Sequence, residues 1–350
     1  MAQQSGLAQR EAGLGRWRAA ARDLFPGYFA VVMATGILSI AADTDGAGRL
    51  SAALLVVCVL CYLVLAALSG WRLASYRPRF LADATSPRTA FLMFTFVAGS
   101  EVLGARLAGA GYQPVTVLLL ILGGLAWLLL GYGIPLALIT RRGQQSALKD
   151  ACGNWFLWTV GTQSIAVAIT FLARPVPSAL AALAVLLWAA GVVLYLITAA
   201  AVLASLLHFP VRPAVLSPAS WVFMGAAAIS VLAGARLLTL PAGALLTAVH
   251  PVLAGLSVIL WAFGTWLLPL LAGLSAWRHL AGGIPLRYEP GLWSMVFPLG
   301  MYCVASEALG HAVRVPWLVS VGHLGSYLAF TVWAVVFAAM LAALVSRPSR

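Results

Sequence analysis

Charged side chains are scarce in this sequence: Asp, Glu, Lys and Arg together make up 9% of its 350 residues. A soluble domain carries roughly 25% charged residues, so this chain cannot cover a water-facing surface. A soluble globular enzyme and a disordered chain are both excluded. Hydrophobic residues make up 63%, and mean hydropathy is +0.99. Continuously apolar runs of about 20 residues recur along the chain. They predict an all-α integral membrane protein.

Cysteine and recognisable catalytic motifs are scarce too. The four cysteines are too few and too dispersed for a disulfide framework. Cys58 and Cys61 form a C-x-x-C in an apolar helix without a neighbouring acid or histidine, which favours packing over a redox or metal site. The five histidines form no H-x-x-x-H or H-E-x-x-H pattern. No nucleophile elbow, phosphate loop or paired catalytic acids occur, so we expect no enzyme, no cofactor and no resident metal.

The apolar runs predict ten transmembrane helices. Residues 1–24 form a basic segment, in which Arg16 to Phe25 could lie along the membrane interface as a short helix. Residues 25–346 form the transmembrane transport domain, and residues 347–350 a short tail. The ten expected spans are 27–43, 50–70, 89–108, 114–140, 154–172, 178–207, 218–238, 250–277, 291–309 and 315–345.

The positive charges predict the orientation. The net charge of +12 lies mostly in short loops, where a membrane surface explains it better than nucleic acid does. With ten spans and a cytoplasmic N-terminus, 16 of the 21 basic residues lie inside. We therefore expect a multi-pass protein of the plasma (inner) membrane with both ends cytoplasmic. The five outer arginines are Arg49, Arg106, Arg174, Arg236 and Arg314.

A repeat runs through the odd-numbered spans. Pro26, Gly27, Val32 and Gly36 match Pro290, Gly291, Val296 and Gly300 at one offset of 264 residues. The third and seventh spans both open on Ser-Pro and close on Gly-Ala-Arg-Leu. Entry points at 26, 87, about 153, 218 and 290 lie 61 to 72 residues apart. The pattern predicts five tandem helical hairpins in one orientation, related by an axis normal to the membrane.

The two kinds of span differ in chemistry. Even spans consist mainly of Leu, Val and Ala, whereas odd spans carry small and hydroxyl residues. Polar helices should face inward and apolar ones the lipid, so we expect five odd helices to enclose a narrow central pore. For any single residue, close helix packing is the alternative. The expected lining residues are Thr35, Gly36, Ser39, Thr95, Gly99, Thr159, Thr162, Gly225, Ser230 and Gly300.

Charges near the span ends indicate candidate functional groups. Arg106 and Arg236 occupy matching repeat positions and are the stronger candidates for attracting anions; snorkelling to headgroups is the alternative. Glu101 and Glu307 are the most deeply embedded acids. Either could carry a proton, although an ion pair with Arg106 would explain Glu101, and a helix-end hydrogen bond to His311 would explain Glu307.

Phe297 is the one bulky residue at an otherwise small, inward-facing place, and Pro298 follows it. Its repeat partner in the first span is Met33. Pro298 removes a backbone donor and can kink the helix. The phenyl ring at such a kink could plug a narrow pore, and packing against a neighbouring helix is the alternative.

Two segments resemble a known family. Phe25 to Ser39, with the sequence FPGYFAVVMATGILS, resembles the first helix of the tellurite-resistance/dicarboxylate transporter family, and Trp293 to Gly300 (WSMVFPLG) resembles its ninth helix. The family belongs to the voltage-dependent anion channel superfamily. It includes bacterial tellurite-resistance permeases, plant guard-cell slow anion channels, fungal malate permeases and fungal sulfite exporters. Span count and hairpin spacing extend the resemblance over nearly the whole chain.

The resemblance implies a pore of five tandem hairpins, assembled as a homotrimer with one pore per subunit. It also implies that Phe297 takes the position of the family's gating phenylalanine. The chain departs from relatives in having Met-Ala-Thr-Gly in its first helix, where Met-Gly-Thr-Gly is frequent, and in lacking long regulatory tails. We expect an anion channel or transporter for a small inorganic anion, sulfite or a C4-dicarboxylate. A proton-coupled dicarboxylate or sulfite carrier is the alternative; the anion and the relevance of tellurite stay open.

Overall fold

Helices make up nearly all of the computed structural model, which describes residues 15, 17–140, 147–172, 175–210, 217–241 and 243–346. This part of the chain contains no strand. Most of the basic segment 1–24, the tail 347–350 and Arg174 lie outside the described residues. Of the expected interfacial helix, Trp17–Arg22 is helical.

Helices occur in all ten ranges expected from the sequence. Five of them are the odd-numbered, inner helices, and three-residue or four-residue 3₁₀ turns precede all but the first: α2 (Ala30–Thr44), α5 (Phe94–Gly109), α7 (Leu157–Thr170), α9 (Val222–Leu237) and α11 (Trp293–Ala312). The five outer helices are α3 (Gly48–Ser75), α6 (Gln113–Ile139), α8 (Ser178–His208), α10 (Ala244–Leu280) and α12 (Pro316–Val345). A short helix that the sequence did not predict, α4 (Arg77–Thr85), follows α3.

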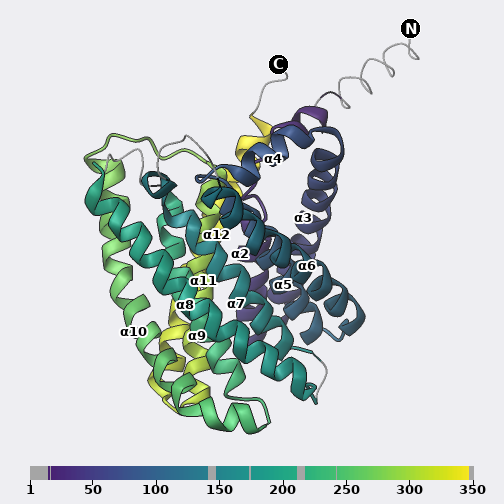
Figure 1. The fold of residues 1–350 in the computed structure, drawn as a ribbon, viewed down its shortest axis with the longest axis vertical. Coiled ribbons are helices and arrows are strands. Elements are labelled where there is room, and N and C mark those ends of the chain that lie inside the picture. The colour runs from purple at the N-terminus through teal and green to yellow at the C-terminus, as the bar shows by residue number, and fades with distance from the viewer. Residues whose placement is uncertain are drawn as a thin grey trace.

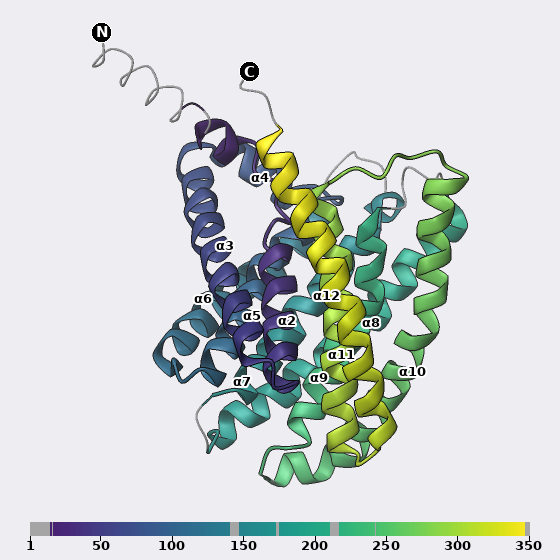
Figure 2. The same cartoon turned by 180° about the vertical axis from the view of Figure 1, so that it is seen from behind.

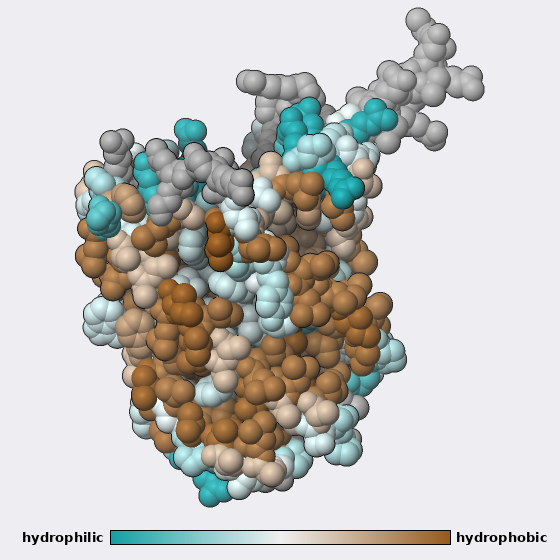
Figure 3. All heavy atoms as spheres, viewed as in Figure 1, coloured by the Kyte–Doolittle hydropathy of each residue, from teal (hydrophilic) through white to brown (hydrophobic). Residues whose placement is uncertain are grey.

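Eight of these helices, some counted with the preceding 3₁₀ turn, are long and apolar enough to cross a membrane. The other two are inner helices: α2 is a shorter apolar helix of 15 residues, and α7 has 14 residues. Ten crossings therefore stay a prediction. Figure 3 shows a broad apolar belt around the middle of the molecule with hydrophilic residues towards both ends, as expected of a protein embedded in a bilayer.

Inner and outer helices differ sharply in burial. In the most apolar stretches of α5, α9 and α11, 78–89% of residues are buried, against 17–44% in the outer helices. The exposed residues of the outer helices are mainly Leu, Val and Ile, for example Leu129 and Leu196. This confirms the sorting expected from composition: small and hydroxyl residues face the protein, and large aliphatic ones face outward.

The inner helices form a closed ring. Each packs against two others, in the order α2, α5, α7, α9, α11 and back to α2. Each also packs against the outer helix that follows it in the chain. The end of α12 lies beside α4 at the end of the molecule where both termini are marked (Figures 1 and 2). The contacts thus close the inner helices into one ring, and five membrane-spanning hairpins around a central pore stay a prediction.

Hydrogen bonds join each hairpin to the next. Every outer helix places a Trp or Tyr against a polar group of the following inner helix, and α12 returns to α2. The pairs are Tyr62 with Ser100 (2.9 Å), Trp127 with Thr162 (2.8 Å), Trp188 with the Ser230 carbonyl (3.0 Å), Trp261 with Ser306 (2.8 Å) and Trp333 with Thr35 (3.0 Å). Such bonds between membrane helices contribute on average about 0.6 kcal/mol each. The ring is therefore closed by polar bonds as well as by packing.

The turns from inner to outer helix also repeat. Gly46, Gly111 and Arg314 follow α2, α5 and α11 with φ of 76°, 88° and 58°. In each case the next amide donates to a carbonyl five residues earlier, as in Ala47 to Ala42. This is the Schellman pattern, in which a left-handed residue ends the helix. Three of the five hairpins thus turn in the same way.

Candidate functional site

The C-terminal ends of all five inner helices surround a cavity of ≈ 250 Å³, which we call the wide cavity. Ile40 and Asp43 line it from α2, Arg106 from α5 and Arg236 from α9. Phe171, directly after α7, and Glu307 and His311 of α11 complete its polar and aromatic lining. Helix C-termini carry partial negative charge. Arginines in the last turns of α5 and α9 offset that charge.

Arg106 is held in a network at the junction of α2, α3 and α5. Its guanidinium donates to the Ser39 hydroxyl (3.0 Å), to the Ser51 hydroxyl (2.8 Å) and to Asp43 (3.2 Å). The residue is only 7% exposed. Ser39 and Ser51 in turn donate to each other's backbone carbonyls. Arg106 therefore fastens three helices together while it lines the cavity.

Arg236 is placed differently. Its guanidinium carbon lies 4.1 Å from the centre of the Phe171 ring, and Nε lies 3.5 Å from the Thr170 hydroxyl. A guanidinium over an aromatic face is a cation–π contact of about 0.5–2 kcal/mol. Arg236 thus holds the aromatic ring at the floor of the wide cavity.

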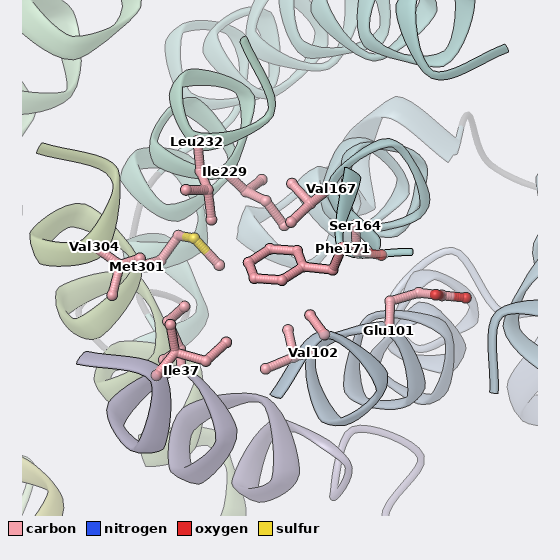
Figure 4. A pocket seen from close by; sticks show the side chains of 12 residues that line it. Ile37, Glu101, Val102, Ser164, Val167, Phe171, Ile229, Leu232, Met301 and Val304 are labelled. Carbon is pink, nitrogen blue, oxygen red and sulfur yellow. The ribbon is translucent and has the colours of Figure 1, made fainter. Parts of the chain in front are cut away.

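A second space, the narrow cavity, lies on the ring axis beside Phe171, on the side nearer the N-terminal ends of the inner helices. Its volume is only about 20 Å³. Figure 4 shows the Phe171 ring at its centre, surrounded by Ile37, Val102, Val167, Ile229 and Met301. Room for one water molecule needs roughly 10–15 Å³. The axis is therefore constricted here by apolar side chains from every inner helix.

Phe297 lies one turn nearer the start of α11 than Met301, and Met33 lies one turn before Ile37 on α2. Residues four apart share a helix face, so both side chains continue the faces that line the narrow cavity. Each is 1% exposed, and neither lines the narrow or the wide cavity. Pro298 packs against α9 where Gly225 leaves room, since a Cβ there would lie 2.8 Å from the proline ring.

The remaining predicted lining residues lie at helix contacts. Gly36, Gly99 and Gly300 pack against Val102, Phe29 and Ile37 of neighbouring inner segments. The hydroxyls of Thr35 and Thr162 accept bonds from outer helices, Ser39 binds Arg106, and Thr95 and Ser230 donate to carbonyls of their own segments. Of the predicted lining residues, Thr159 is the one whose hydroxyl is buried without a hydrogen-bond partner in the described part of the chain. Their role as pore lining stays a prediction.

The two embedded acids are not brought together. Glu101 is 1% exposed, packs against Gly123 of α6, and has neither carboxylate oxygen bonded within the described chain. In Figure 4 its carboxylate points away from the central ring of Phe171. Glu307 lies at the wide cavity with Oε1 buried and unbonded among the described residues. The suggested partners differ as well: Arg106 binds Asp43, and His311 lines the same cavity without a recorded bond to Glu307.

Phe171 is the functional candidate that the sequence did not single out. It follows the last turn of α7, in the aliphatic stretch Ala166 to Leu172. Nothing in that stretch distinguishes a ring on the axis from one facing lipid. One signal was available in the sequence. Phe171 lies four residues after Val167 and seven after Ser164, so the three side chains share one helix face.

Comparison with known proteins places the chain among membrane transport proteins. Residues 23–341 match the sequence model of a family described as "Voltage-dependent anion channel". An uncharacterized membrane protein of Mycobacterium tuberculosis is 45% identical over 160 residues, covering 45% of this chain and 81% of the relative. An uncharacterized transporter of Methanocaldococcus jannaschii is 24% identical over 331 residues, covering 90% of this chain and 91% of the relative.

Proposed function

Because the chain belongs to the voltage-dependent anion channel family, we propose that its five inner helices surround a path along which small anions cross the bilayer. The wide cavity carries the proposal: it lies on the axis of the closed ring, and two arginines line it. The family and its transporter relative support a channel or transporter rather than an enzyme. The substrate class is a small inorganic anion, sulfite or a C4-dicarboxylate.

The electrostatic potential differs between the two ends of the path. Their N-termini, with partial positive charge, lie at the end where the termini are marked. Arg106 and Arg236 serve the wide cavity at the opposite end. A negative cell interior drives an anion outward by roughly 2.3 kcal/mol per charge per 100 mV. With both ends cytoplasmic, a passive path would therefore release anions from the cell.

Two aromatic rings close this path. Phe297 is the gate, supported by its burial on the face that lines the narrow cavity one turn further along the helix. Phe171 forms a second constriction, held by Arg236. Conduction requires both rings to leave the axis.

Reversal potentials test the proposed function directly. The protein is reconstituted in planar bilayers with chloride, nitrate, sulfite or malate on one side. A shift of the reversal potential towards the anion's equilibrium potential supports an anion path and ranks the substrates. Currents that follow the cation gradient would contradict the proposal.

The arginine at the wide cavity gives a sharper test. A charge 4 Å from an anion contributes about 1 kcal/mol in water, so Arg236→Gln should lower anion flux into liposomes about fivefold at low salt, and less at high salt. Arg49→Gln is the matched control, because Arg49 lies at the same end of the molecule but is exposed and outside the cavity lining. Equal losses in both variants would contradict a specific role for Arg236.

A proton-coupled carrier is the second candidate, and buried Glu101 favours it. An unpartnered carboxylate inside the protein is costly when charged, so a transport cycle that protonates it is chemically plausible. Substrate accumulation that requires an imposed pH gradient, and is lost in Glu101→Gln, would support the carrier. Flux through the wild type that is indifferent to the gradient would support the channel.

The proposal extends to the membrane, the partners and the oligomeric state of the protein. The transport domain spans residues 25–346 and sits in the plasma (inner) membrane, with lipid and the small anion as its partners and no nucleic acid. Three copies assemble as a homotrimer with one path each. A link to tellurite resistance belongs to the family resemblance alone.

A further inference from the structure

Three potential metal ligands meet at the edge of the wide cavity. Asp45 follows α2, Glu307 lies on α11 and His323 on α12. One ligand atom from each lies within 4.8 Å of the other two. The closest pair is His323 Nδ1 and Asp45 Oδ1, at 2.6 Å. The sequence predicted no metal site, because these residues are up to 278 positions apart.

Glu307 is the member of this cluster that lacks a structural explanation. The residue is 5% exposed, and its Oε1 is buried without a hydrogen-bond partner among the described residues. The Glu307 side chain packs against α12 at Gly322, where a Cβ would lie only 2.5 Å from Glu307 Cγ. A buried carboxylate beside the second carboxylate of Asp45 is unfavourable unless a cation compensates it.

The two arginines that line the cavity make contacts of their own. The Arg106 guanidinium already donates hydrogen bonds to Asp43, Ser39 and Ser51. Arg236 lies over Phe171 on the α9 side of the cavity. His323 contacts Asp45. In the described part of the chain no ion pair includes Glu307, and the ion pair at the cluster joins His323 to Asp45. At most one positive charge therefore faces two carboxylates.

We propose that Asp45, Glu307 and His323 bind a divalent transition-metal ion, with Zn²⁺ the preferred occupant. One imidazole nitrogen and two carboxylate oxygens suit Zn²⁺, whereas Ca²⁺ takes six to eight oxygen ligands and Mg²⁺ octahedral oxygen sites. Zn²⁺ ligands lie about 2.0–2.2 Å from the ion in a tetrahedral arrangement, so His323 Nδ1 and Asp45 Oδ1, now 2.6 Å apart, must separate to admit the ion, and Glu307 must move towards it. Three protein ligands leave a fourth position for water or an anion.

The surroundings of His323 fit this role. Metal binding needs an unprotonated Nδ1, which places the imidazole proton on Nε2. The Tyr327 hydroxyl lies 3.5 Å from Nε2 and can accept that proton's hydrogen bond. Outer-shell acceptors of this kind fix the tautomer of ligating histidines. If the ring is doubly protonated beforehand, binding releases one proton.

A bound dication would change the wide cavity as well. Glu307 lines that cavity, where its negative charge repels anions. Zn²⁺ would neutralise the two carboxylates and place an open coordination position at the edge of the anion path. This consequence rests on the proposed function, whereas metal binding itself does not.

Isothermal titration of the chelator-treated full-length protein in detergent with ZnCl₂ tests the site. The expected result is one Zn²⁺ per chain, with at least tenfold weaker binding in His323→Ala and in Asp45→Asn. His311→Ala is the matched control, because His311 lines the same cavity but lies outside the cluster. It should bind Zn²⁺ like the wild type. Mg²⁺ and Ca²⁺ should bind far more weakly.

Co²⁺ absorption gives a second readout, which reports the type and number of the ligands directly. Co²⁺ bound by nitrogen and oxygen ligands shows visible d–d bands, which excess Zn²⁺ should abolish, and which His323→Ala should lose. If the wild-type protein does not bind one equivalent of Zn²⁺, the proposal is wrong. A shared proton would then compensate the negative charge of the Glu307 carboxylate. Equal weakening by His311→Ala would also overturn it. Anion flux plays no part in either measurement, so a failure of the proposed function is seen separately.

Discussion

Replacing Phe297 by alanine raises anion flux through liposomes at least about tenfold, if the ring is the gate. The side chain is 1% exposed and continues the faces that line the narrow cavity. Its removal takes away the largest apolar group at that level of α11, beside Pro298. A tenfold increase needs the barrier to fall by only about 1.4 kcal/mol, which is modest for the loss of a phenyl ring from a constriction.

Two companion variants make this result specific. Phe171→Ala should raise flux less, because Phe171 is half-buried at a helix end and can swing into the wide cavity. Phe263→Ala removes the same ring from α10, where the side chain is 37% exposed and off the axis, and should leave flux unchanged. If Phe297→Ala conducts no more than the wild type while folding normally, the gate assignment is wrong.

Arg106→Met destabilises the protein by about 2–3 kcal/mol, because hydrogen bonds to charged groups contribute roughly 1.5–3 kcal/mol each. The variant keeps the length of the side chain but removes all donors to Ser39, Ser51 and Asp43. The two serines keep their bonds to each other's backbone, so the loss stays below the sum of the separate bonds. Thermal unfolding in detergent measures the change.

Arg236→Met serves as the control for that experiment. Arg236 lies on Phe171 rather than at a junction of three helices, so its loss should lower flux far more than stability. The sequence analysis predicts the same role for both arginines, because they occupy matching repeat positions. Equal stability losses in the two variants would contradict the division of roles that the contacts indicate.

The helices were predictable from the sequence, and their contacts were not. Long apolar runs define where a chain can cross a bilayer, so the ten expected ranges match α2 to α12 closely, apart from α4. Glycine and hydroxyl content correctly separated inner from outer helices. Which way an individual hydroxyl points depends on helix rotation and on its neighbours. Thr35 and Thr162, for example, meet tryptophans of other hairpins.

The groups on the axis were harder to predict for the same reason. Phe171 and Met301 are ordinary apolar residues in apolar helices, and only the closed ring brings them together around the narrow cavity. Asp45, Glu307 and His323 come from the first and last hairpins, which meet because the ring closes. A spacing rule for metal ligands cannot detect residues that only ring closure brings together.

Water access to the ring axis is the most direct test of the account. In a cysteine-free Phe297→Ala background, Leu232→Cys places a thiol on α9 between the narrow and wide cavities. Ile259→Cys on α10 places one on the outer face, where the side chain is 61% exposed. A charged methanethiosulfonate reagent should modify the first and block anion flux, and leave the second unmodified. An unreactive Leu232→Cys, or undiminished flux after its modification, would contradict an anion path through the inner helices.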